Sequence, residues 1–170
     1  MKLELTSTVK TVVFSEVEKY LQGLGLTVVS KDTNRPWGGF FVIDEKQAHH
    51  FGKLFFPGEN ISDLYIGTKL SPKILLVQPK TRLSWQYHHR RAEIWRVVTG
   101  LAGVVTSNTD QEGVLQELKT GETIRLAQGQ RHRLVGLDGW GIIAEIWQHT
   151  DVANPSDEED IVRVQDDFGR

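Results

Sequence analysis

The chain has 170 residues, 39% of them hydrophobic and 25% charged, with a formal net charge of −2, which suits one soluble globular domain. A slightly acidic chain has no global positive field to attract a polyanion, so we expect no nucleic-acid partner. The lack of cysteine excludes disulfides and thiolate metal sites. We expect a cytoplasmic protein with no membrane association, because there is no apolar signal-peptide core and no apolar run of membrane-spanning length.

Residues 1–34 are predicted to form an N-terminal arm and helix. The arm, residues 1–14, is predicted to be extended, with VKTVVF as its apolar part. Ser15 and Glu18 have the spacing of a capping box, so the helix is predicted to begin at Ser15. Gly25 can adopt the left-handed conformation that ends a helix. This helix would pack on the rest of the chain or on a partner subunit, which makes a homodimer possible.

From Leu26 onward the sequence changes to short segments rich in β-branched and aromatic residues, separated by glycine and other turn residues. Short strands at regular spacing are typical of an antiparallel sandwich or barrel. We therefore predict an all-β fold for residues 35–170. The predicted strands lie in residues 26–30, 38–44, 73–79, 82–88, 94–100, 101–107, 113–121, 123–129, 132–137 and 140–147.

Two further segments need a separate interpretation. Residues 45–72 form a long, mixed stretch, which we interpret as an insertion that carries a hairpin or a lid over one mouth of the barrel. The tail, residues 155–170, is acidic but contains Ile161, Val162 and Val164. It is predicted to dock on the barrel, with a solvated tail as the alternative.

Metal-binding side chains occur in two separated segments. In a strand, alternate side chains share a face, so Gln86 and His88 should point the same way. Glu93 follows after a short turn and can return beside His88, and His132 opens a later strand. Two imidazoles, one carboxylate and one amide carbonyl suit a divalent metal with a position left open. We predict a catalytic metal site formed by Gln86, His88, Glu93 and His132.

The same two segments resemble the paired motifs of the cupin superfamily. Residues 79–100, PKTRLSWQYHHRRAEIWRVVTG, resemble the first motif, with Lys80 in place of its first glycine and Gln86 in place of its first histidine. Residues 121–134, GETIRLAQGQRHRL, resemble the second motif, with Ala127 in place of the usual proline. The resemblance implies a cupin barrel, also called a double-stranded β-helix or jelly roll, with a short N-terminal helix.

More narrowly, the chain is similar to the cupin domain of type II mannose-6-phosphate isomerases. Arg35–Gly38 matches the Arg-Pro-Trp-Gly that opens that domain, and residues 159–170 match its ending. LSWQYHHRRAEIW is similar to the family block LSLQ-M-HHHRAEHW, with Arg90 and Ile94 where that block has histidines. In this family the domain is often fused to a guanylyltransferase domain. A chain of this length has no room for one, so we expect a stand-alone cupin.

The resemblance implies metal-dependent aldose–ketose isomerisation of a sugar phosphate, most specifically of mannose 6-phosphate to fructose 6-phosphate. Zinc is the first choice of metal, with iron, manganese, nickel and cobalt as alternatives. One alternative is a non-catalytic cupin module that binds a sugar phosphate. Another is a different cupin enzyme, such as a metal dioxygenase or a nucleotide-sugar epimerase.

Such a reaction needs a group that carries a proton and a cationic clamp for the phosphate. Glu145 is the candidate acid/base, because burial in an otherwise apolar strand beside Trp147 would raise its pKa. A structural carboxylate paired with an arginine is the alternative. The candidate substrate-binding residues are Arg82 and Arg90, which share the metal face by alternation, Lys80, which continues it, and Arg133, which alternates away from His132. Simple surface solvation is the alternative for each.

Overall fold

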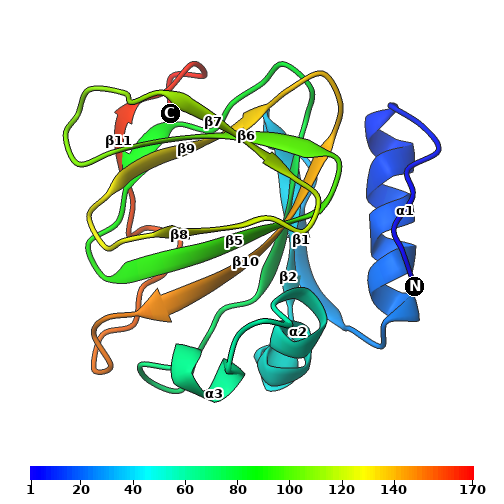
Figure 1. Cartoon of the computed structure of the whole chain (residues 1–170), viewed down its shortest axis with the longest axis horizontal. Coiled ribbons are helices and arrows are strands. Elements are labelled where there is room, and N and C mark those ends of the chain that lie inside the picture. Colours follow the sequence, from blue (N-terminus) through cyan, green and yellow to red (C-terminus); the bar gives the residue numbers. More distant parts are fainter.

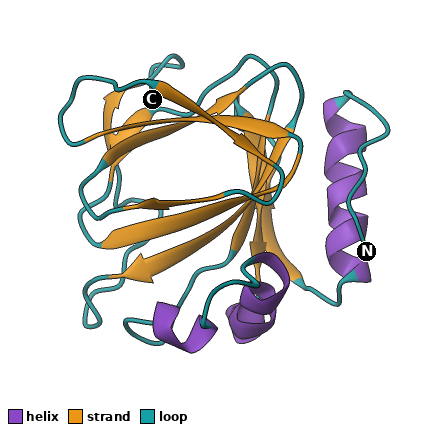
Figure 2. Cartoon of the chain, viewed as in Figure 1, coloured by secondary structure: helices purple, strands orange, loops and turns teal.

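The computed structural model describes all 170 residues and consists of two antiparallel β-sheets that form a barrel, with helices packed outside it (Figure 1, Figure 2). The strand order is β1-β2-β3-β10-β5-β8 in the six-stranded sheet and β11-β4-β9-β6-β7 in the five-stranded sheet. The prediction of an all-β barrel with an N-terminal helix is therefore confirmed.

Every segment predicted to be a strand overlaps one. The six-stranded sheet consists of β1 (Val28–Asp32), β2 (Gly38–Ile43), β3 (Lys73–Val77), β5 (Arg91–Thr99), β8 (Thr123–Leu126) and β10 (Gly141–His149). The five-stranded sheet consists of β4 (Trp85–Tyr87), β6 (Leu101–Ser107), β7 (Leu115–Lys119), β9 (Arg131–Gly136) and β11 (Val162–Gln165). The tail docks on the barrel, because β11 pairs with β4.

The turn from β5 to β6 explains the glycine that closes the first motif. Gly100 has a φ of 81°, which is the left-handed region, and a Cβ at this position would lie 2.1 Å from the carbonyl oxygen of Trp140. A side chain is excluded there by both the conformation and the close approach. The glycine thus lets β5 reverse tightly into β6.

Strand β10 is buried on both faces and divides two regions of packing. Alternate residues point outward and are buried against the helices, namely Ile142, Ala144 and Ile146. The residues between them point into the barrel, where Ile143 joins the interior core and Glu145 and Trp147 line a cavity. The period-two pattern of the strand thus carries one carboxylate into the barrel interior.

The N-terminal helix, α1 (Lys10–Gly23), is longer than predicted and begins at Lys10 rather than at Ser15. The prediction of an extended arm through residue 14 was wrong, because Val13 and Phe14 lie on the same buried face as Val17. That burial outweighs the missing cap, since Val9 at the N-cap position offers no side-chain acceptor. Gly25 ends the helix region as predicted, with a φ of 75°.

The segment 45–72 folds as helices and not as a hairpin, because its apolar residues have helical spacing. It contains a short 3₁₀ turn (Glu45–Gln47), α2 (Ala48–Phe55) and α3 (Ile61–Leu64). Phe51, Phe55 and Ile61 are buried in the core between the six-stranded sheet and the helices. No residue of this segment lines the cavity of the barrel, so it covers the outside of the sheet. It is not a lid over the site.

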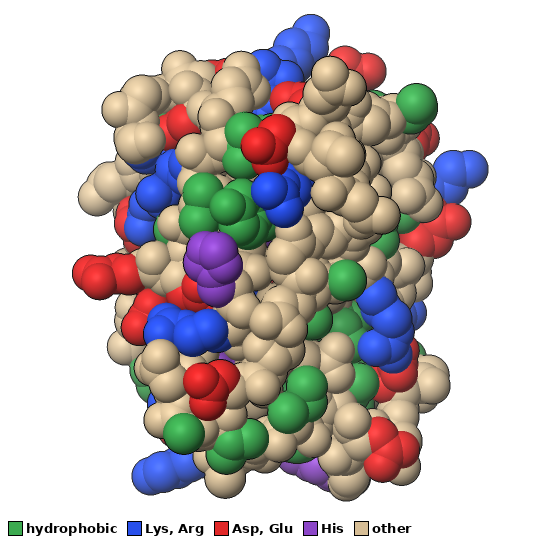
Figure 3. All heavy atoms as spheres, turned by 90° about the vertical axis from the view of Figure 1, so that its left-hand side faces the viewer, with side chains coloured by type: hydrophobic (Ala, Val, Ile, Leu, Met, Phe, Trp, Pro, Cys, Tyr) green, Lys and Arg blue, Asp and Glu red, His purple; other side chains and the backbone are tan.

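The surface shown in Figure 3, which is the left-hand side of Figure 1, carries interspersed acidic and basic side chains around a small hydrophobic group. None of the helices has the length and apolar character needed to cross a bilayer.

Candidate functional site

Three of the four predicted metal ligands converge inside the barrel. His88 follows β4, Glu93 lies on β5 and His132 lies on β9, and one donor atom from each lies within 4.8 Å of the others. All three side chains are buried. His88 Nε2 lies 3.1 Å from Glu93 Oε1, and His132 Nε2 lies 3.4 Å from Glu93 Oε2. The cluster is therefore centred on the Glu93 carboxylate.

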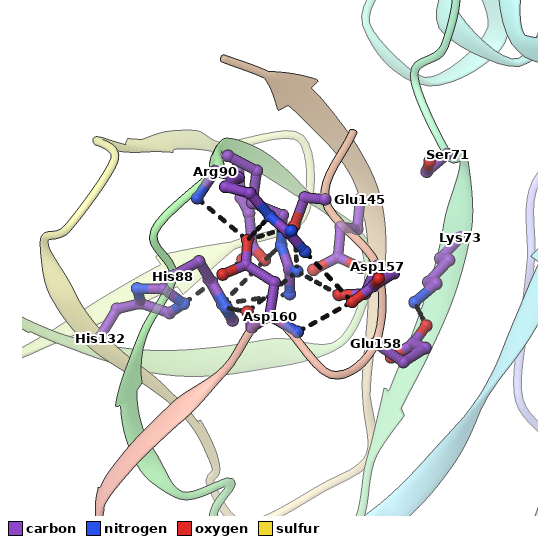
Figure 4. A network of polar contacts seen from close by, with 12 residues as sticks. Ser71, Lys73, His88, Arg90, His132, Glu145, Asp157, Glu158 and Asp160 are labelled. Carbon is purple, nitrogen blue, oxygen red and sulfur yellow. Dashed lines mark hydrogen bonds and ion pairs between the residues drawn. The ribbon is translucent and has the colours of Figure 1, made fainter. Parts of the chain in front are cut away.

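Backbone carbonyls fix the orientation of both imidazoles. His88 Nδ1 lies 2.6 Å from the carbonyl oxygen of Asp160, and His132 Nδ1 lies 2.9 Å from that of Gln130. A carbonyl oxygen can only accept, so Nδ1 carries the proton in each ring. Both Nε2 atoms, which carry a lone pair when the ring is neutral, lie beside Glu93, as in metal ligands held by a second shell. Figure 4 shows His88 and His132 close together, with Asp160 of the tail beside His88.

Two atoms of this cluster are left without a hydrogen bond. Glu93 Oε2 and His132 Nε2 are buried and unpartnered although they lie only 3.4 Å apart. Each buried polar atom left without a partner costs about 1–3 kcal/mol. A divalent cation between them would satisfy both. The nitrogen, nitrogen and oxygen donors suit zinc or another first-row divalent metal.

The ionisation of the cluster also favours a cation. Burial alone would raise the pKa of Glu93, but His88 and Arg91 more than offset this and hold the pKa of the carboxyl well below its ordinary value. Burial lowers the pKa of His88, which keeps its ring neutral near pH 7. Ionised carboxylate and neutral imidazole are the forms in which these side chains bind a metal.

Gln86 lies next to the cluster. It is directly opposite His132 in the pairing of β4 with β9, and it lines the cavity. Its Oε1 accepts a hydrogen bond from Ser84 Oγ at 2.5 Å. A role for Gln86 as a fourth ligand stays a prediction.

A cavity of about 90 Å³ opens beside the cluster, inside the barrel. Its walls combine aromatic and charged side chains. The cationic residues are Arg35, Lys73, Arg91, Arg163 and Arg170, and the acidic residues are Glu93, Glu145 and Glu158. The apolar walls include Trp37, Phe40, Leu75, Leu83, Trp95, Trp147 and Ile161. An excess of cations over carboxylates makes this cavity suitable for an anionic ligand.

Glu145, the predicted acid/base, lies in this cavity and is buried. It is opposite Trp95 in the pairing of β10 with β5, and its Oε1 accepts a hydrogen bond from Trp95 Nε1 at 2.9 Å. Burial, together with the negative charge of Glu93, raises the pKa of Glu145 to about 7, although Lys73 and Arg91 oppose the shift. Glu145 makes no ion pair with an arginine. A carboxyl group that titrates near neutrality is suited to both accepting and returning a proton.

The free energy of unfolding of the wild-type protein should fall as the pH rises from 4.5 to about 7, because Glu145 ionises in a buried position. Glu145→Gln should abolish this fall. The pKa is raised in the folded state, so the unfolded chain releases this proton at lower pH than the folded chain does. At about pH 8 the variant should be more stable by on the order of 1–3 kcal/mol, and near pH 5 the difference should largely vanish. Urea unfolding of metal-free protein at both pH values measures this. Glu117→Gln, an exposed glutamate on β7, is the control. An equal difference at both pH values would contradict the burial argument.

The four cations predicted to hold a phosphate lie outside the cavity. Alternation from residue 82 to residue 90 was expected to place Arg82 and Arg90 beside His88, and this expectation was wrong, because β4 is regular only over Trp85–Tyr87. Arg82 instead pairs with Asp167, with Nε 2.6 Å from Oδ2. Arg90 lies beyond a bend and faces Asp157 and Asp160.

The other two predicted cations, Lys80 and Arg133, also lie away from the cavity. Lys80 is exposed in the turn after β3, with a positive φ of 58°. Arg133 is fully buried on the outer side of the five-stranded sheet, where it donates to the carbonyl oxygen of Leu83 and pairs with Glu112. A binding role for these cations has no support from their positions.

The cavity cations found in the structure were missed by the sequence reasoning. The inward position of Arg91 could have been predicted, because Arg91, Glu93 and Trp95 are alternate residues on one face of β5. Lys73 likewise precedes Leu75 on the inward face of β3. Arg163 and Arg170 reach the cavity only because β11 docks on β4, and no local pattern indicates that pairing.

A barrel of two antiparallel sheets, with a histidine–glutamate–histidine cluster supplied by two separated segments, defines a cupin. Residues 44–166 match the family model described as the C-terminal domain of mannose-6-phosphate isomerase, and the chain belongs to this family.

Curated relatives agree with this assignment. The chain is 30% identical, over 75% of its length, to the mannose-1-phosphate guanylyltransferase ManC of Salmonella typhimurium, of which it covers 25%. It is 31% identical, over 80% of its length, to the xanthan biosynthesis protein XanB of Xanthomonas campestris, of which it covers 23%. The chain thus spans about a quarter of the length of these relatives.

A solved structure supports the fold alone. The KdgF protein from Halomonas superposes with a TM-score of 0.50 at 12% identity, over 76% of this chain and 91% of that chain.

Proposed function

We propose that this cupin is a metal-dependent isomerase of a sugar phosphate that interconverts mannose 6-phosphate and fructose 6-phosphate. The observation that carries the proposal is that Glu93 of the metal-ligand cluster and Glu145, a carboxyl group of raised pKa, line one cavity. Glu93 and Glu145 lie on neighbouring strands, opposite Trp147 and Trp95 respectively. The family description, which names mannose-6-phosphate isomerase, supports the choice of substrate.

Aldose–ketose interconversion moves one carbon-bound proton between C1 and C2 of the open-chain sugar through a cis-enediol, while a second proton passes between the oxygens on C1 and C2. In the proposed reaction Glu145 takes the proton from one carbon and returns it to the other, which a carboxyl group with a pKa of about 7 can do in both directions. The hydrogen bond from Trp95 Nε1 holds the carboxyl group in one orientation. The aromatic side chains in the cavity wall would limit the access of water to the proton in transfer.

The proposed metal ligands are His88, Glu93 and His132, with Gln86 as the fourth. Such an ion, when bound, polarises the sugar carbonyl as a Lewis acid. Zinc is the first choice for two imidazoles and one carboxylate, and iron, manganese, nickel or cobalt would also fit this donor set.

The phosphate of the substrate is proposed to bind the arginines at the mouth of the cavity. Arg35, Arg163 and Arg170 all line it. The Arg163 side chain belongs to an exposed residue but is partly desolvated, which lowers its pKa. Arg170 and Arg35 add to this shift, Asp166 opposes it, and Arg163 makes no ion pair of its own. A dianionic phosphate would relieve this repulsion and accept charge-assisted hydrogen bonds.

Arg163→Gln should raise the KM for mannose 6-phosphate by about 10-fold and leave kcat within about 2-fold, because a contact to a non-reacting phosphate is equally strong in the ground state and the transition state. Steady-state kinetics measure both constants. Arg125→Gln, on β8 and paired with Glu59, is the control and should change neither. A fall in kcat without a change in KM would contradict the assignment of Arg163 to the phosphate.

The alternative is a non-catalytic module that binds a sugar phosphate. It is suggested by the replacement of two family histidines, by Arg90 and Ile94, and by the loss of a motif glycine at Lys80 and a motif proline at Ala127. Both positions at which a histidine is replaced lie off the cavity. Ile94 is buried on the opposite face of β5, in the core under the helices, and Arg90 faces the acidic tail. The two histidine replacements therefore remove no side chain from the cavity, which favours the enzyme.

Incubation of the protein with mannose 6-phosphate or with free mannose distinguishes these functions. We expect ketose to form from the phosphate and much less from free mannose. Thermal stabilisation by mannose 6-phosphate without any product would instead support the binding module.

A further inference from the structure

One cationic side chain lies directly against the metal-ligand cluster. The guanidinium of Arg91 has its Nε 2.8 Å from Glu93 Oε1 and its Nη2 3.2 Å from His88 Nε2. The side chain is buried, with 5% exposure. Arg91 thus contacts two of the atoms that the proposed metal needs.

The hydrogen bond from Arg91 to His88 and a metal ion on His88 Nε2 exclude each other. The Nδ1 proton of His88 is donated to the carbonyl oxygen of Asp160, so Nε2 has no proton and accepts from Arg91. A neutral imidazole has a single lone pair at this nitrogen. That lone pair can serve an N–H group or a metal ion, but not both.

We propose that Arg91 is a displaceable occupant of the metal site, and that metal binding releases its guanidinium to bind an anion in the cavity. The inference rests on the proposed metal site and adds to it a coupling between metal and anionic substrate. Without metal, Arg91 partly neutralises the buried Glu93. When a metal is bound, the ion neutralises Glu93 in place of Arg91, and the guanidinium becomes available to bind an anion.

Other contacts keep the arginine in the cavity wall once it leaves His88. Its guanidinium stacks at 3.6 Å on the ring of Trp147, and its Nη1 donates to Ser156 Oγ at 2.8 Å and to the carbonyl oxygen of Asp157 at 2.9 Å. None of these partners belongs to the cluster. The released group therefore stays where an anion in the cavity can reach it.

The coupling has a direction that can be measured. An anion that binds the released guanidinium favours the metal-bound state, and by reciprocity the metal favours anion binding. Inorganic phosphate should therefore tighten metal binding, and this effect should depend on Arg91.

Arg91→Met, which has a similar unbranched stem and no donor, tests the proposal by competition titration of zinc against a chromogenic chelator. We expect the variant to bind zinc about 10-fold more tightly than the wild type, because the competing hydrogen bond is gone. Phosphate should tighten zinc binding in the wild type and have no effect in the variant.

Lys73→Met is the matched control for the loss of positive charge. Lys73 is a buried cation 4.0 Å from the same Trp147 ring, paired with Glu158 and in contact with no cluster atom. Its zinc affinity should change by less than about 3-fold, and the phosphate effect should persist. If Arg91→Met does not fold, Arg91→Lys, which has no fork to bridge Glu93 and His88, should also tighten zinc binding.

Equal or weaker zinc binding by folded Arg91→Met, relative to wild type, overturns the proposal and leaves the metal site standing. Equal gains in Arg91→Met and Lys73→Met overturn it as well, since the effect would then be one of general charge. Absence of zinc binding in the wild type and in all variants would remove the metal site together with the inference.

Discussion

Glu145→Gln should lower the turnover of mannose 6-phosphate by about 10²–10⁴-fold and leave the bound metal unchanged. An amide cannot take up the proton that moves between C1 and C2. The amide oxygen can still accept from Trp95 Nε1, so the local geometry should be retained. Steady-state kinetics and metal analysis of the same preparation measure the two effects separately.

The control for this variant is a second glutamate of the same cavity. Glu158 lines the cavity and pairs with Lys73, but it is not buried within an apolar strand. Glu158→Gln should cost less than about 10-fold in turnover, because it removes no proton carrier. Near-normal turnover by Glu145→Gln would exclude Glu145 from the chemistry.

Glu93→Gln should weaken divalent-metal binding by at least about 100-fold and abolish metal-dependent turnover. Glu93 is the only anionic member of the cluster and contacts both histidines. A neutral amide cannot offset the charge of the ion in a buried site. Metal content after dialysis against a weak chelator, compared with that of wild type and Glu145→Gln, measures this loss.

Circular dichroism should show that Glu93→Gln is folded, although it leaves the guanidinium of Arg91 without its carboxylate partner. Retention of stoichiometric metal by the folded variant would show that the metal binds elsewhere in the chain.

Most of the barrel could be predicted from the sequence, because strands and turns are specified by residues that are close together in the chain. Short β-branched runs end at residues such as Gly100, whose left-handed φ no other residue adopts easily. The placement of His88, Glu93 and His132 followed from motif spacing. Glu145 followed from the period of two in β10, which buries one carboxylate among apolar residues.

The remaining features depend on tertiary packing that the sequence does not display. α1 begins at Lys10 because its apolar face meets the sheet, not because a capping residue starts it. The prediction that Arg82 and Arg90 bind the phosphate was wrong because it assumed a strand from residue 82 to residue 90, whereas β4 contains only three residues. Arg163 and the carbonyl oxygen of Asp160 reach the site only because the tail docks on the barrel. The contact between His88 and Asp160, for example, joins residues that are 72 positions apart in the chain.

The most direct test is the formation of fructose 6-phosphate from mannose 6-phosphate by one preparation before chelation, after chelation and after metal is restored. We predict turnover by the original protein, loss of turnover on metal removal, and recovery on addition of zinc or another divalent ion that suits the cluster. Turnover that is unchanged in fully metal-free protein would contradict a metal-dependent isomerase, and so would the lack of any product from metal-loaded protein.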